Sequence, residues 1–143
     1  MYLTPHFTLQ ELTLSQVAAR DGLLNTPAPD VQANLKLLCL VLEQVRELVA
    51  APIIISSGFR CAELNRRVGG AVDSAHVRGL AADFSSPACS PRELAERIRD
   101  SELVFDQLIL EFDQWVHLAV TPDTPRREVL TVRRGTGYLP GIR

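Results

Sequence analysis

The sequence contains no long uninterrupted hydrophobic run and no excess of charge of either sign. The apolar stretch 35–49, for example, includes the charged residues Lys36 and Glu43, so it is too polar to span a membrane. The 15 Lys and Arg residues nearly balance the 17 Asp and Glu residues, and the formal net charge is -2 at pH 7. Because a nucleic-acid backbone is bound by a basic surface, this balance argues against DNA or RNA as a partner.

Cysteine is scarce, and its three residues have no paired short spacing. We expect Cys39, Cys61 and Cys89 to be free thiols in a reducing compartment. The N-terminus lacks the basic start and apolar middle of a secretion signal, so we expect synthesis in the cytoplasm. A chain of this length can bury a core without disulfides, which favours a single domain. We expect its core within residues 7–133 and an irregular tail at 134–143.

Helical patterns dominate the first part of the chain. Thr8 and Glu11 form a capping box. Asp30 is expected to cap a second helix, in which apolar residues recur at three- and four-residue steps as far as Val49. Later helices are expected at 61–68 and 90–99, and strands at 53–56, 81–85, 105–111, 115–120 and, as an edge strand, 129–132. This order favours an α+β fold in which N-terminal helices pack on a small, mostly antiparallel sheet.

The segment SAHVRGLAAD at residues 74–83 contains two good metal ligands, His76 and Asp83. A fully extended link between them would span roughly 23 Å, whereas the ligands of one ion lie a few ångströms apart. The chain must therefore reverse direction, and Gly79 is placed where left-handed backbone angles would be needed. On these two residues alone, a surface histidine and an aspartate that caps a turn remain the alternative.

His117 lies inside the apolar run WVHLAV, where a histidine is costly unless its ring nitrogens have partners. It is either a core histidine bonded to a backbone carbonyl or a third ligand beside His76 and Asp83. Three nitrogen and oxygen ligands with a fourth position left for water are typical of a catalytic zinc site.

Several segments together resemble the zinc D-alanyl-D-alanine peptidases of the M15 family, particularly the short phage and prophage members that cut peptidoglycan. The likeness reaches about residue 120 and is carried by SSGFR at 56–60, LNRRVGG at 64–70, SAHVRGLAAD at 74–83, FDQLILEFDQWVHLAV at 105–120 and the N-terminal FTLQELTLSQVAARDGLLNTP. The resemblance implies a Hedgehog/DD-peptidase-like fold with one Zn²⁺ per chain. The zinc ligands that it implies are His76, Asp83 and His117.

The resemblance also assigns substrate-binding roles. Arg60 matches the arginine of the family's serine-glycine-x-arginine motif, which holds or polarises the substrate peptide, and a guanidinium suits a carboxylate or a developing oxyanion. A surface ion pair is its alternative role. Ser74 is expected to bond within the ligand loop or to substrate, and Trp115 to form a wall of the cleft or to pack in the core.

Metal-assisted peptide hydrolysis also requires a general base. Some M15 members carry an acid three positions before the final histidine, but this chain has Gln114 there, which cannot act as a base. A three-residue hairpin loop would pair Ile109 with His117 and place Glu111 on the same sheet face as His117. A two-residue turn would instead favour Asp113. Glu111 is the preferred base, and a solvated turn carboxylate is the alternative role for either residue.

The expected function is hydrolysis of peptidoglycan stem peptides by a zinc peptidase, as a carboxypeptidase or an endopeptidase. The alternative is a catalytically inactive zinc-containing module that binds cell-wall peptide or a protein partner. Gln114 supports this alternative because it stands where some M15 members carry an acidic residue. A thiol site at Cys61 or Cys89 is disfavoured because neither has a nearby histidine in the sequence. We expect a monomer. By resemblance to phage lysins, we expect it to reach the wall through a holin-type release system or on a phage particle.

Overall fold

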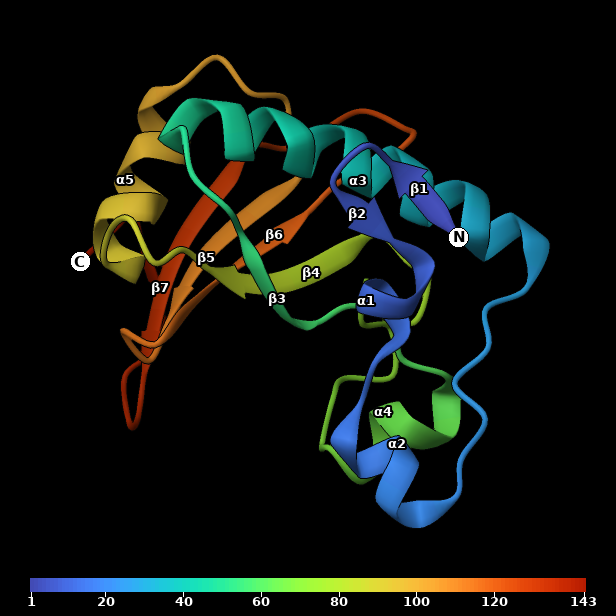
Figure 1. Ribbon diagram of the computed structural model, residues 1–143. Helices are drawn as coiled ribbons and strands as arrows, with labels where there is room; N and C mark the ends of the chain where they lie inside the picture. The colour runs from blue at the N-terminus through green and yellow to red at the C-terminus, as the bar shows by residue number, and fades with distance from the viewer.

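The computed structural model describes residues 1–143 as one α+β domain (Figure 1). Its helices are α1 (Leu9–Thr13), α2 (Gln16–Asp21), α3 (Pro29–Val49), α4 (Ala62–Arg67) and α5 (Pro91–Asp100). Its strands are β1 (Tyr2–Thr4), β2 (Phe7–Thr8), β3 (Ile54–Ser57), β4 (Ala81–Ser85), β5 (Gln107–Glu111), β6 (Trp115–Ala119), β7 (Glu128–Arg133) and β8 (Gly137–Pro140). No helix combines the length and the apolar character that crossing a membrane requires.

Six strands form one sheet in the order β3-β4-β6-β5-β7-β8, and β1 and β2 form a separate small hairpin. Every neighbouring pair in the large sheet is antiparallel except β5 and β7, which are parallel. The expected α+β class and mostly antiparallel sheet are therefore confirmed, and the sheet as a whole is mixed.

One face of the large sheet packs on α3 and α5, which Figure 1 shows on the same side. Alternate strand residues enter this core because successive side chains of a strand point to opposite faces. The strand residues in the core include Ala82, Phe84, Leu108, Leu110, Val116 and Leu118. The strand residues between them, which include Asp83, Glu111 and His117, point to the opposite face of the sheet.

The N-terminal helix begins as expected. The Thr8 side chain accepts a hydrogen bond from the backbone N–H of Glu11, and the Glu11 side chain accepts one from the backbone of Thr8. Helix α3 differs from expectation at its start, because Ala28 is the N-cap residue and Asp30 lies in the first turn. Proline at the first helical position and an acidic first turn suit a helix N-terminus without a side-chain cap.

The expectation of an irregular tail at 134–143 is wrong. Residues Gly137–Pro140 form β8, which pairs antiparallel with β7. Consequently β7 is not an edge strand. Gly135 and Gly137 have positive φ angles, so the glycines that suggested irregular structure instead make the turn between the two strands.

Gly79 ends the loop that leads into β4 and presses against α3. Its φ is 72°, and an added Cβ would lie 2.8 Å from Cγ1 of Val31 and 2.9 Å from the Val31 carbonyl oxygen. Gly69 provides a matched comparison, since its φ is 76° but an added Cβ would meet nothing within 4 Å.

We expect Gly79→Ala to lower the free energy of unfolding by roughly 2–5 kcal/mol, as the sum of backbone strain and overpacking. Gly69→Ala carries only the backbone cost, about 1–2 kcal/mol. Urea denaturation of both variants measures the difference. Equal losses would show that contact with α3 does not restrict residue 79.

Candidate metal centre and cleft

Three buried side chains meet on the sheet face opposite α3 and α5: His76, Asp83 and His117. One ligand atom from each lies within 4.8 Å of the others. Asp83 on β4 and His117 on β6 are paired directly across neighbouring strands, while His76 comes from the preceding loop. The structure thus brings together the three residues that the resemblance identified as ligands.

The His76 ring is held by a backbone contact on its far side. Its Nδ1–H donates to the carbonyl oxygen of Gly58 over 2.7 Å, which leaves Nε2 facing Asp83 at 3.3 Å from Oδ1. A backbone carbonyl behind a histidine is a common way to fix the tautomer and orientation of a metal ligand. The positive φ at Gly79 supplies the expected reversal between His76 and the strand.

Asp83 lies between the two histidines. Nδ1 of His117 is 2.9 Å from the same Oδ1 atom that His76 approaches. Burial would by itself raise the pKa of Asp83, but hydrogen bonds from His117 and His76 outweigh burial and hold the pKa well below its usual range. The carboxylate is therefore ionised at neutral pH and available as an anionic ligand.

This donor set fits a single zinc ion better than a hard cation. Two imidazole nitrogens and one carboxylate match a three-ligand catalytic zinc site, whereas calcium takes six to eight oxygen ligands. The imidazole nitrogen facing the group is Nε2 for His76 and Nδ1 for His117. Ring centroids of the two histidines are 5.2 Å apart, and both rings contact Oδ1 of Asp83.

The group opens into a cleft with a volume of about 720 Å³. Its lining includes all three members of the group together with Glu111, Arg60 and the loop around Ser74. A pre-formed cleft of this size with convergent polar groups is typical of a ligand or substrate site.

Glu111 lies on the cleft side of β5, as the three-residue loop requires. Ile109 pairs with His117 and Glu111 with Trp115. The Trp115 Nε1–H donates to Oε1 of Glu111 over 2.7 Å. Burial raises the pKa of Glu111 and the negative charge of Asp83 raises it further, against smaller opposing effects from His117 and Trp115.

Asp113 points away from this site. Its carboxylate accepts two hydrogen bonds from Arg133, over 2.8 and 3.1 Å, and it does not line the cleft. The Arg133 guanidinium lowers the pKa of Asp113. The hairpin loop thus places one of the two candidate bases in the cleft and the other in a surface ion pair.

Arg60 is mostly buried and lines the cleft, with Nη2 3.8 Å from Oδ2 of Asp83. Ser74 accepts a hydrogen bond from the backbone N–H of His76 over 3.3 Å, so it stabilises the ligand loop.

Trp115 does not line the cleft. Its expected role as a cleft wall is therefore corrected: the aromatic lining residues are Phe112 and Tyr138, and Tyr138 was missed because its segment was expected to be irregular.

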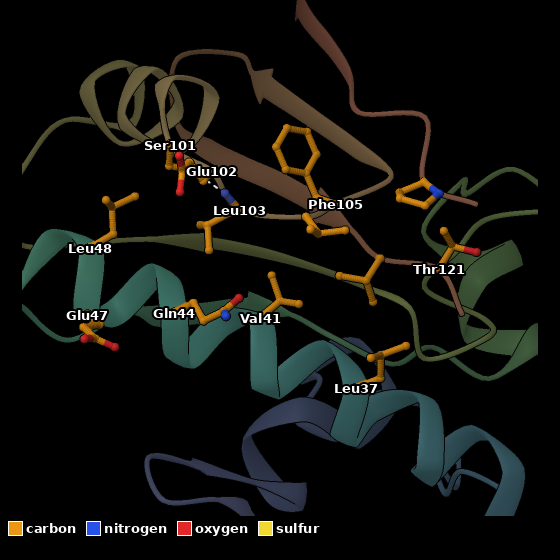
Figure 2. Close-up of a pocket in the computed structure, with 13 residues that line it drawn as sticks. Leu37, Val41, Gln44, Glu47, Leu48, Ser101, Glu102, Leu103, Phe105 and Thr121 are labelled. Atoms are coloured by element: carbon orange, nitrogen blue, oxygen red, sulfur yellow. Dashed lines mark hydrogen bonds between the residues drawn. The ribbon is translucent and has the colours of Figure 1, made fainter. Parts of the chain in front are cut away.

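A second hollow lies between α3 and residues 101–105 (Figure 2). Its volume is about 580 Å³, and its lining is mostly apolar, with side chains such as Val41 and Phe105. It shares no lining residue with the cleft and contains no histidine or cysteine. The His-Asp-His group therefore lies outside this hollow.

A family model described as Peptidase M15 matches residues 5–119, which is more than half of the chain. The matched region contains the His-Asp-His group, Arg60 and Glu111. A comparison with curated proteins finds no match.

Proposed function

Because this chain belongs to the M15 peptidase family, we propose that it is a zinc metallopeptidase that hydrolyses peptide bonds in the stem peptides of peptidoglycan. The observation that carries the proposal is the buried His-Asp-His group opening into a cleft that also contains the Glu111 carboxylate. Metal ligands, a base and a space for substrate are the parts that metal-assisted peptide hydrolysis needs.

His76, Asp83 and His117 would hold the zinc ion. When bound, zinc supplies Lewis acidity, which lowers the pKa of a coordinated water towards about 7 and polarises a carbonyl. The sheet pairing of Asp83 with His117 and the carbonyl behind His76 orient these ligands before any metal arrives.

Glu111 is suited to accept a proton from the attacking water and return one to the leaving amine. Its raised pKa makes it a better proton acceptor than an ordinary glutamate, because a base works best when its pKa approaches the operating pH. The hydrogen bond from Trp115 holds Oε1 of the carboxylate and leaves the lone pairs of Oε2 free to accept a proton. Trp115 is thus proposed to orient the base.

Arg60 is suited to bind the substrate carbonyl or a carboxylate. Its guanidinium is next to Asp83 and is mostly shielded from water, where a fixed positive group stabilises developing negative charge best. Arg78 also lines the cleft, which supports a peptide substrate that carries carboxylates, as cell-wall stem peptides do. The Arg126 guanidinium in the same lining is already bonded to the Asp106 carboxylate.

The direct test is incubation of the zinc-loaded protein with purified muropeptides, followed by mass spectrometry. We expect zinc-dependent cleavage: loss of a terminal alanine would identify a carboxypeptidase, and separation of cross-linked dimers an endopeptidase. A chelator-treated sample is the control. Intact muropeptides of several wall chemotypes after incubation with folded, zinc-bound protein would contradict hydrolysis and favour a non-cutting module that binds wall peptide.

A further inference from the structure

Asn65 is a buried polar residue that lies outside the metal group and the proposed base. It belongs to α4, and only 3% of its surface is exposed. A buried side-chain amide requires hydrogen-bond partners for both its oxygen and its nitrogen. The hydrogen-bond partners of the Asn65 side chain therefore show which groups it positions.

Both ends of the Asn65 amide are used. Oδ1 accepts a hydrogen bond from Nη1 of Arg60 over 3.0 Å, and the Nδ2 group donates to the carbonyl oxygen of Ala71 over 2.8 Å. The reverse orientation of the amide would face a donor with a donor and an acceptor with an acceptor. Asn65 therefore joins the arginine of the cleft to the loop that lines the cleft.

The Arg60 guanidinium is held on three sides. Its Nε–H donates to Oγ of Ser57 over 3.4 Å, Nη1 is bound by Asn65, and Nη2 is 3.8 Å from Oδ2 of Asp83. The contact with Asn65 is the shortest of the three. Because a guanidinium is planar, fixing one edge sets the direction in which its remaining N–H groups point.

Gly70 packs directly on this contact. An added Cβ at Gly70 would lie 2.0 Å from Oδ1 of Asn65 and 2.8 Å from Nη1 of Arg60. A side chain at this position would displace the amide or the guanidinium. Because glycine has no side chain, position 70 leaves the space in which the side chains of Arg60 and Asn65 meet.

We propose that Asn65 is a positioning residue that holds the Arg60 guanidinium in the cleft, and that Gly70 must lack a side chain for this contact to form. The effect on catalysis rests on the proposed function, because it acts through the substrate contact of Arg60. The placement of the guanidinium is a property of the folded chain and can be tested without hydrolysis.

The first test uses NMR of the ¹⁵N-labelled, zinc-loaded full chain. The Nε–H resonance of Arg60 is assigned by its absence in Arg60→Lys. We expect it to move to the position of solvent-exposed arginines in Asn65→Leu, which preserves volume but removes the acceptor. Gly70→Ala, which keeps Asn65 and displaces it, is expected to shift the resonance in the same direction. Arg66→Gln, an exposed neighbour on α4, is the control.

An unchanged Arg60 resonance in a folded Asn65→Leu or Gly70→Ala protein would overturn the proposal. Thermal unfolding of each variant shows whether it is folded, and the Gly70 variant keeps the test decisive if Asn65→Leu does not fold. Failure of the wild-type protein to hydrolyse muropeptides would contradict the proposed function but would leave this readout intact.

The second test is a double-mutant cycle on muropeptide hydrolysis. We expect Asn65→Leu to lower kcat/KM by about 10- to 100-fold, as is usual when the support of an active-site group is lost. In an Arg60→Ala background the same substitution should lower it less than about 2-fold, because Asn65 then has no guanidinium to hold. Additive losses would show that Asn65 does not act through Arg60. Val72→Ala, exposed in the same loop, is the activity control.

Discussion

Glu111→Gln is expected to lower kcat for peptide hydrolysis by about 10²- to 10⁴-fold, the usual contribution of a general base. Glutamine keeps the shape of the side chain and can still accept the hydrogen bond from Trp115, but it cannot take a proton. Zinc content, measured by atomic absorption, should remain one ion per chain because Glu111 is not a member of the His-Asp-His group.

Asp113→Asn is the matched control for this substitution. Asp113 bonds to Arg133 on the surface and does not line the cleft, so its kcat should remain close to that of the wild-type protein. Comparable losses in both variants would contradict the assignment of Glu111 as the base. Full activity of Glu111→Gln would place the base elsewhere in the cleft.

The raised pKa of Glu111 also predicts how pH affects the stability of the metal-free protein. Ionisation of Glu111 disfavours the folded state, so metal-free Glu111→Gln should be more stable than wild type at neutral pH. That difference should disappear as pH falls below the pKa of glutamate in the unfolded chain, and urea denaturation across this range measures it.

The sequence predicted the centre of the fold better than its ends. The strand at 81–85 was foreseen because its apolar run has sharp boundaries. For the hairpin before Trp115 the sequence left a three-residue loop and a two-residue turn open, and the pairing of Glu111 with Trp115 selects the three-residue loop. The tail was misjudged because a glycine-rich segment can be a loop or a tight turn between strands. Only the pairing of β8 with β7, a tertiary contact, decides between them.

Some features of the site could be predicted from the sequence and others could not. Glu111 and His117 could be placed on one sheet face from the register of a three-residue hairpin loop. Only the resemblance implied that Asp83 joins His117, because the two-residue period of strands does not relate residues of different strands. The contact between Asn65 and Arg60 could not be predicted, because a helix and a loop supply the two partners and no periodic pattern relates them. Tyr138 lines the cleft because β8 pairs with β7, and the sequence of the tail did not predict that pairing.

Asp83→Asn is expected to abolish both zinc-dependent stabilisation and hydrolysis. In the wild-type protein, zinc at 100 times its dissociation constant should raise the free energy of unfolding by about 2.7 kcal/mol, because it binds the folded chain and not the unfolded one. Asparagine has the same shape as aspartate but removes the anionic ligand between His76 and His117. It also leaves the mostly buried Arg60 without its neighbouring negative charge.

Titration with zinc, followed by urea denaturation and calorimetry, measures both effects. His6→Ala is the matched control, since it removes a histidine that is bonded to Glu43 and lies outside the metal group. Its zinc response and activity should equal those of the wild-type protein. A wild-type protein that takes up no zinc, or Asp83→Asn protein that binds zinc as tightly as wild type, would contradict the assignment, because the carboxylate is the only anionic member of the group.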